Sequence, residues 1–220
     1  MIYGLQPKSI KPIIVITLPY AGKRFEDIAH HLASAETLVE PKGIMEASWS
    51  HQKLKLAGFL EVSACLGIFP VQASLHEENQ FSRGSSITCD AKYFDGANLA
   101  AIAVATVGNS AEEECSKLYR RGEYIDAIVL DAMASTALED AITEIRMRVR
   151  NSIGSGRLGH NLFPGTKPMP VEVLKTVFSL LRPERTVFVN LMESMIMIPI
   201  KSISVIIPAG PELVACCDDD

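Results

Sequence analysis

The sequence predicts a single α+β domain. Three observations favour this fold class: short β-rich runs are mixed with helical repeats, one run of small apolar residues resembles a buried strand, and no segment rich in Pro, Gly and Ser divides the chain. Of the 220 residues, 48% are hydrophobic and 21% are charged, which is ample for a core and shows no signature of disorder. We therefore expect one domain over 1–220, with 211–220 forming a flexible tail.

The first half of the chain gives the weaker secondary-structure signals. A β-rich run at 13–18 predicts a strand, and apolar residues at steps of three and four predict a helix over 24–39. Strands are expected at 44–49 and 55–62. The segment 77–86 is polar enough to be a loop.

The signals become clearer from residue 99 onward. The uninterrupted apolar run 99–107 predicts a buried strand. Asn109 or Ser110 can cap a helix that ends at Arg121, because acidic residues crowd its first turn and basic residues its last, as the helix dipole favours. A second, long helix is expected over 123–149.

The C-terminal part predicts a loop, a helix and two strands. Three glycines after residue 153 mark a loop, and Pro170 suits the first turn of a helix over 171–181. The β-rich runs 185–191 and 201–207 are expected to form an antiparallel pair.

Charge and cysteine content exclude several functions. A net charge of −5 and a pI near 5.6 offer no basic face for a polyanion, so we expect no nucleic-acid partner. The five cysteines are odd in number and form no CxxC pair, which argues against a disulfide framework or a zinc knuckle. The chain shows no cleavable signal pattern and no apolar run long enough to span a bilayer. The cytoplasm is the expected location, with no membrane partner.

Motifs for hydrolysis, metal binding and nucleotide binding are missing from the sequence. There is neither a GxSxG elbow nor an HExxH pair, and the adjacent His30 and His31 would point about 100° apart on a helix. The glycines at 154–156 follow a predicted helix rather than a strand, so they lack the framework of a phosphate-binding loop. We therefore expect no catalytic and no metal-binding residue.

The loop around Pro164 and Gly165 is the strongest candidate for a binding site. Pro168 and Pro170 make this loop rigid, and Gly165 allows close approach of the backbone to a ligand. Backbone groups in such a loop can recognise a flat or zwitterionic small molecule. The alternative is a plain turn that leads into the following helix. We expect the functional surface to lie between residues 161 and 207.

Three further polar residues interrupt apolar surroundings. Glu193 and Ser194 lie in an apolar run, and Glu139 lies in a helix of small residues. A carboxylate in such a place either faces solvent or is buried and needs a hydrogen-bond partner. Methionines that alternate near Glu193 are expected to be core packing: Met192, Met195 and Met197.

Five segments follow one another in an order that is typical of one family. They are LVEPKGI (38–44), FDGANLAAIAVATVG (94–108), YIDAIVLDAMASTALED (124–140), FPGTKPMP (163–170) and MESMIMIPIKSISVII (192–207). With them the chain resembles the activation domain of cobalamin-dependent methionine synthase, in a stand-alone form. The order and spacing match over roughly the last 125 residues, and the match is looser over 1–90.

The resemblance implies an α+β fold built on a twisted antiparallel sheet flanked by helices. In that family the domain binds S-adenosylmethionine and docks on a corrinoid-carrying domain, where it permits reductive methylation of inactive cobalt(II) cobalamin. The implied partners are a corrinoid-binding protein, or a methionine synthase lacking its activation domain, and a flavodoxin or ferredoxin-type electron donor. The chain would then be an accessory domain or subunit of a cobalamin-dependent methyltransferase, with cobalamin carried by the partner.

The resemblance also implies a set of ligand-binding residues: Glu139, Asn161, Gly165, Thr166, Glu193 and Ser194. Asn161 stands where the family has an arginine, and Thr166 stands where it has a tyrosine. An amide cannot replace the charged fork of arginine, and losing such a contact costs on the order of 2 kcal/mol. S-adenosylmethionine binding is then weakened, replaced or lost, unless Arg157 reaches back to the loop.

Three other functions stay open at this point. The first is a small-molecule-binding or regulatory module that keeps the fold, and corrinoid-protein contacts, but not S-adenosylmethionine. The second is an independent methyltransferase, although no general base or acceptor pocket can be named. The third is a purely structural role, because a fold does not fix a function.

Overall fold

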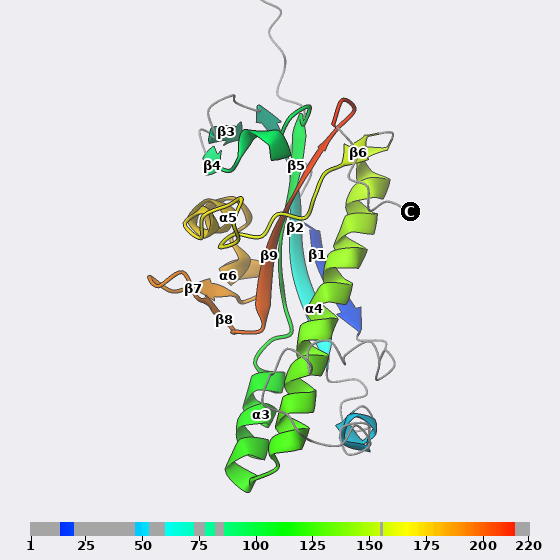
Figure 1. Ribbon diagram of the computed structural model, residues 1–220, viewed down its shortest axis with the longest axis vertical. Helices are drawn as coiled ribbons and strands as arrows, with labels where there is room; N and C mark the ends of the chain where they lie inside the picture. Colours follow the sequence, from blue (N-terminus) through cyan, green and yellow to red (C-terminus); the bar gives the residue numbers. More distant parts are fainter. Residues whose placement is uncertain are drawn as a thin grey trace, which may run out of the picture.

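The computed structural model describes residues 14–19, 47–52, 60–72, 78–81, 86–154 and 156–213. Within these ranges the chain forms a curled antiparallel sheet flanked by helices (Figure 1). The predicted α+β class is confirmed. The predicted helix over 24–39 lies outside the described residues.

The main sheet has seven strands in the described part of the chain. They are β1 (Ile14–Pro19), β2 (Glu61–Gln72), β3 (Glu78–Phe81), β4 (Ser86–Thr88), β5 (Leu99–Thr106), β6 (Arg157–Leu158) and β9 (Ser202–Gly210). The order across the sheet is β4-β3-β2-β5-β9-β6, and β1 pairs with β2 on the same side as β3. The strands β7 (Asn190–Leu191) and β8 (Met197–Ile198) form a separate two-stranded ribbon.

Helix α4 (Tyr124–Ile153) packs alanine against alanine on the central strand β5. Alternation along β5 places Ala101, Ala103 and Ala105 on the face of the sheet that α4 covers. The helix contributes small buried residues of its own: Ala127, Ala134, Ala137 and Ala141. Small side chains on both sides allow the 30-residue helix to lie close to the sheet along much of its length.

The opposite face of the sheet carries a second core. Ile102 and Val104 of β5 point to this face, where they meet Val177 and Leu181 of α5 (Val173–Leu181). The 3-10 turn η1 (Ala91–Tyr93) and the short helix α6 (Pro183–Thr186) cover the rest of this face. Figure 1 shows α4 and α5 on opposite sides of the sheet.

The predicted strand and helices between residues 99 and 181 are confirmed. Helix α3 (Ser110–Arg121) ends at Gly122, which has a left-handed φ of 79°. Asn109 occupies the N-cap position, but its side chain makes no capping hydrogen bond. No helix among the described residues combines the length and the apolar character needed to cross a bilayer.

Two predictions in the first half of the chain are wrong. Residues 47–52 are helical instead of forming a strand, and the buried side chains of Ser48 and Gln52 share one helix face. The Ser48 hydroxyl donates a hydrogen bond to Asp126 of α4, so a tertiary contact helps to stabilise this helix. Of the strand expected at 55–62, residues 61 and 62 belong to β2, and residues 55–59 lie outside the described ranges. The polar segment 77–86 contains β3, which pairs with β4.

The expected pairing of 185–191 with 201–207 is also wrong. Pro183 stands at the first position of α6, where its fixed φ suits a helix, and residues up to Thr186 are helical. The strand at the end of that run, β7, pairs with β8, and β9 pairs instead with β5 and β6. The buried strand β5 therefore has an apolar partner on each side, β2 and β9.

Residues 211–213, the first of the segment expected to form a tail, lie within the described part of the chain. Leu213 is buried in the core beneath α5, and its carbonyl oxygen accepts a hydrogen bond from Arg157 at 3.4 Å. Residues 214–220 lie outside the described ranges.

Lys201 joins the beginning of β9 to three other elements. Its backbone N–H donates to the Glu112 carboxylate of α3 at 2.7 Å, and its carbonyl oxygen accepts from the Val107 N–H, just after β5, at 3.0 Å. Its ammonium group lies 2.9 Å from both the Asp131 carboxylate and the Ser135 hydroxyl of α4. One residue thus fixes the sheet against both α3 and α4.

Replacing Lys201 by methionine should lower the free energy of unfolding by about 1 kcal/mol or more, because a partly buried ion pair and a hydrogen bond are lost. Urea unfolding followed by circular dichroism measures this change. Lys117→Met is the matched control, since Lys117 pairs with Glu114 on an exposed helix face, and about 0.5 kcal/mol or less is expected there. Equal losses in both variants would contradict a structural role for the Lys201 junction.

Burial raises the pKa of all three thiols in the described part of the chain, and for two of them it reaches about 11. Burial raises the pKa of Cys89 to about 11, and the neighbouring Asp90 carboxylate adds to the effect. Burial likewise raises the pKa of Cys115 to about 11, with the charge of Asp131 as a further cause. Both thiols therefore stay protonated at physiological pH.

These raised pKa values predict a loss of stability at alkaline pH. The folded state of Cys89 keeps its proton up to about pH 11, whereas the unfolded state releases it near 9.0. The stabilising contribution is therefore complete below pH 9.0 and is lost as the pH rises through about 11. Melting temperatures measured from pH 8 to about 11 should fall more steeply for the wild type than for Cys89→Ala. Parallel curves for the two proteins would contradict this assignment.

Candidate functional site

The loop between β6 and α5 crosses the edge of the sheet from one face to the other (Figure 1). Two backbone hydrogen bonds of 2.9 Å pair Leu162 with Ile206 of β9, and the Gly159 N–H donates to the Pro208 carbonyl at 2.8 Å. Phe163 packs against the core beneath α4, whereas Met169 belongs to the core beneath α5. The loop therefore has access to both layers of helices.

The turn at Gly165 is held by its own hydrogen bonds. The Gly165 N–H donates to the Met169 carbonyl at 3.0 Å, and the Thr166 hydroxyl donates to the Phe163 carbonyl at 2.7 Å. Gly165 has a φ of 90°, and an added Cβ would meet only Val171, at 3.6 Å or more. The backbone conformation, and not a close contact within the chain, therefore demands glycine here. Thr166 is exposed at the turn and open to solvent on its outer side.

A guanidinium group lies beside Asn161, although the loop itself has no arginine there. Arg146 of α4 donates from Nη1 to the Gly159 carbonyl at 2.7 Å and to the Asn161 side-chain oxygen at 3.2 Å. Arg157 points elsewhere, toward the Leu213 carbonyl. The loop is thus contacted by a positive charge that comes from the neighbouring helix α4.

Glu139 lies on the same face of α4 as Arg146. Seven residues separate them, which is nearly two helical turns, or about 10 Å along the helix axis. Glu139 is exposed. This face of α4 therefore carries side chains of both signs, and Arg146 is the one that contacts the loop.

Glu193 and Ser194 lie apart from this group. Both are exposed in the turn between β7 and β8, where the Met192 N–H donates to the Ile196 carbonyl at 2.9 Å. Figure 1 shows the β7–β8 ribbon on the side of the sheet opposite to α4. The six residues expected to bind a ligand therefore fall into a group on the loop and α4, and a pair on the ribbon. Their part in binding stays a prediction.

The other side of the loop carries an aromatic contact. The rings of His160 and Tyr93 meet edge to face, with centroids 5.9 Å apart, and the Lys92 ammonium lies 5.0 Å from the centre of the Tyr93 ring. Lys92 also pairs with Asp90 at 3.1 Å, and this hydrogen bond lowers the pKa of the Asp90 carboxyl. The Asp90 N–H donates to the Pro168 carbonyl at 3.3 Å, which ties η1 to the loop.

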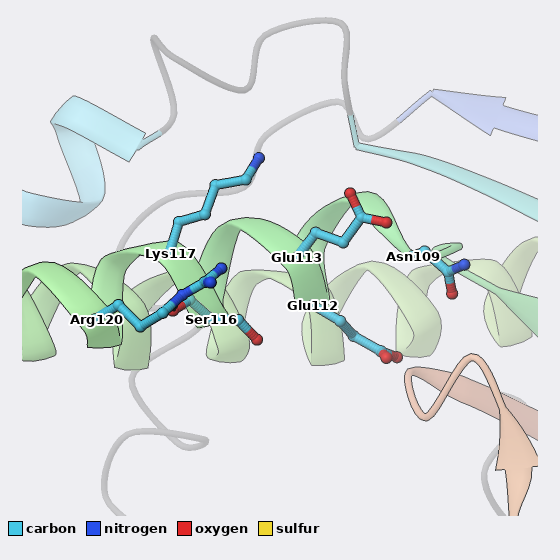
Figure 2. A pocket seen from close by; sticks show the side chains of 6 residues that line it. All are labelled: Asn109, Glu112, Glu113, Ser116, Lys117 and Arg120. Carbon is cyan, nitrogen blue, oxygen red and sulfur yellow. Dashed lines mark hydrogen bonds between the residues drawn. The ribbon is translucent and has the colours of Figure 1, made fainter.

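A hollow of about 450 Å³ lies far from the loop, along α3 (Figure 2). The described residues that line it are polar and come from α3 and the position before it: Asn109, Glu112, Glu113, Ser116, Lys117 and Arg120. Their charges are of both signs, and Glu112 is already engaged by the backbone of Lys201. Because a single helix provides this lining, it does not bring polar groups together around one ligand, and we assign no function to the hollow.

Sequence reasoning missed Arg146 as a candidate site residue. Arg146, Arg148 and Arg150 alternate near the end of a helix, a place where basic residues complement the helix dipole without any ligand. Arg146 differs from Arg148 and Arg150 only because the loop after residue 156 runs back along α4 and brings Gly159 and Asn161 next to it. Arg148 instead forms an ion pair with Glu144 at 2.7 Å on the exposed side of the helix.

Comparison with known proteins supports the fold. No protein-family model matches the chain, and no curated protein matches it in sequence. Among solved structures, the chain is similar to the crystal structure of the MetH reactivation domain bound to AdoHcy, with a TM-score of 0.67. The likeness covers 96% of this chain and 83% of that chain, at 14% sequence identity. The fold implied by the sequence resemblance is therefore confirmed, and this chain has the fold of the MetH reactivation domain.

Proposed function

We propose that the chain binds S-adenosylmethionine, or AdoHcy, on the loop 159–170 and the adjoining face of α4. In this role it supports reductive remethylation of cob(II)alamin on a corrinoid-carrying partner. One observation carries the proposal: Arg146 contacts Asn161 beside the Gly165 turn, in a fold whose solved relative was crystallised with AdoHcy.

The charges on α4 suit the amino-acid end of such a ligand. S-Adenosylmethionine carries a carboxylate, an ammonium group and a sulfonium centre. The Arg146 guanidinium, 3.2 Å from Asn161, offers a positive charge for the carboxylate at the place where the related family has its arginine. Glu139, about 10 Å away along the same helix face, offers a negative charge for the cationic groups. In this proposal Arg146 of α4 provides the positive charge that Asn161, in the loop, does not have.

The loop contributes shape more than charge. Its backbone is fixed by hydrogen bonds to Ile206 and within the Gly165 turn, so its peptide groups are preorganised before a ligand arrives. The side of Gly165 where a Cβ would lie meets only Val171, which leaves room for a flat group against the backbone. Thr166 provides a hydroxyl in place of an aromatic ring, so we expect less stacking with an adenine than a tyrosine would give.

The proposed role demands positioning rather than bond chemistry from this chain. The bound S-adenosylmethionine supplies the methyl group, and an external flavodoxin or ferredoxin-type protein supplies the electron. The residues of the chain hold and orient the methyl donor beside the partner. This division of work agrees with the lack of a catalytic motif in the sequence.

Isothermal titration calorimetry with S-adenosylmethionine and with AdoHcy tests the binding site. Arg146→Ala should weaken binding by about tenfold or more, because a charge-assisted hydrogen bond is worth roughly 1.5–3 kcal/mol. Arg148→Ala is the matched control, since its guanidinium pairs with Glu144 on the solvent side of the same helix, and it should bind like the wild type. Melting temperatures of both variants separate a loss of binding from a loss of folding.

An exchange of residues gives a sharper test of the displaced charge. Asn161→Arg combined with Arg146→Asn returns the arginine to the loop and should recover most of the affinity that Arg146→Ala loses. Asn161→Arg alone should not tighten binding, because it places two guanidinium groups against each other. Wild-type affinity in Arg146→Ala would refute the assigned role of Arg146. No binding of either compound to the wild type would favour a module that has exchanged its ligand.

The reaction is tested with a methionine synthase that lacks its activation domain and carries cob(II)alamin. Adding this chain, S-adenosylmethionine and reduced flavodoxin should convert the visible absorption spectrum of cob(II)alamin into that of methylcobalamin. Mixtures without S-adenosylmethionine, or with Arg146→Ala, should show little conversion. An unchanged spectrum with every corrinoid-carrying partner would remove the proposed role, even if the ligand binds.

A further inference from the structure

The β7–β8 ribbon exposes its apolar face to solvent. Asn190 pairs with Ile198 and Leu191 with Met197, so alternate residues of both strands lie on the same face. The inner face is formed by Val187 and Val189, which are buried, and by Met197, which packs against the core beneath α5. The outer face should be polar if it met only water.

The outer face carries one polar residue, Asn190, which pairs with Ile198, and its other exposed residues are large and apolar. Their exposed fractions are 77% for Phe188, 53% for Met192, 52% for Ile196, 38% for Ile198 and 66% for Ile200. The Met192 N–H donates to the Ile196 carbonyl at 2.9 Å, so these two residues lie opposite each other at the tip, and Phe188 and Ile200 are exposed at the other end of the ribbon. The expectation that the methionines are core packing is therefore wrong for Met192, which lies on this outer face.

We propose that this outer face is the contact between two copies of this chain, with the ribbons packed face to face across a two-fold axis. Such a contact is self-complementary, because the same residues are buried on both sides. It would also cover the outer face of a ribbon whose inner face already packs against the core beneath α5.

The exposed apolar area fits a dimer contact of ordinary size. At roughly 150–200 Å² for a fully exposed large apolar side chain, the five exposed fractions amount to roughly 500 Å² per chain. A stable interface buries about 800 Å² on each partner, and in a homodimer about 65% of that area is apolar. The apolar part of such an interface is therefore about 500 Å² as well.

Charges on the ribbon select the direction of packing. Residues 187–200 contain one charged side chain, Glu193 at the tip, whereas Arg185 is exposed at the base of the ribbon, 4.0 Å from the Glu184 carboxylate. A two-fold axis perpendicular to the strands sets the tip of one ribbon over the base of the other, so that Glu193 of each chain faces Arg185 of its partner. The alternative arrangement, tip against tip, would bring the two Glu193 carboxylates together.

The proposed contact does not involve Arg146, because Figure 1 places the ribbon on the side of the sheet opposite to α4. Sedimentation velocity of the full chain, from about 1 µM to about 200 µM, should show a concentration-dependent dimer. Phe188→Asn and Ile200→Asn should each raise the dissociation constant by about tenfold or more, because each removes one of the two most exposed apolar side chains of this face. Asparagine suits position 188, where φ is 59°.

Matched variants decide whether the effect belongs to this face. Met147→Asn removes an apolar side chain of similar exposure, 50%, from α4 and should leave the dissociation constant unchanged. Glu193→Arg and Arg185→Glu should each weaken the dimer, and the two changes together should restore it. A wild type that stays monomeric at about 200 µM would overturn the proposal. So would a dimer that the ribbon substitutions leave intact, because its contact would then lie elsewhere.

Discussion

The contact between the alanines of β5 and those of α4 is the constraint on which the rest of the structure depends. The strand contributes only methyl groups to this contact, from Ala101, Ala103 and Ala105. The helix contributes methyl groups as well, from Ala134 and Ala141. A leucine at any of these positions would push the helix outward by the length of its side chain. The short reach from Arg146 to the edge of the sheet exists because the helix and the sheet lie so close together.

Helix α4 is fastened to both ends of β9, and the two fastenings are chemically different. At the beginning of β9, the Lys201 ammonium meets the carboxylate of Asp131. Near the end of β9, Gly159 donates to the Pro208 carbonyl and accepts from Arg146. The loop that carries Asn161 is therefore held between a helix and a strand that are already fixed to each other. Such a loop holds its shape without help from a ligand.

The sequence predicted those elements whose formation depends on neighbouring residues, such as a continuous apolar run or the charges at the ends of a helix. The apolar run of β5 and the charge distribution of α3 are readable residue by residue, and both elements occur as expected. Residues 185–191 carry a β-rich composition, yet Pro183 begins a helix there and β9 finds its partner in β5, about 100 residues earlier. Likewise, the loop and its Gly165 turn could be found from the sequence. Arg146 could not, because its role depends on where the chain returns after the helix.

The number of residues between Asp131 and Arg146 fixes the directions in which these two side chains leave α4, and therefore whether both can reach their partners. Each residue turns the helix by about 100°, and fifteen residues separate Asp131 from Arg146. One residue inserted between them would rotate Arg146 by about 100° away from Asn161 while Asp131 stayed on Lys201. An insertion of seven residues, by contrast, would restore the direction to within about 20° but would carry Arg146 about 10 Å past the loop. Homologous chains with this arrangement should therefore differ in the identity of the residues between these positions, but not in their number.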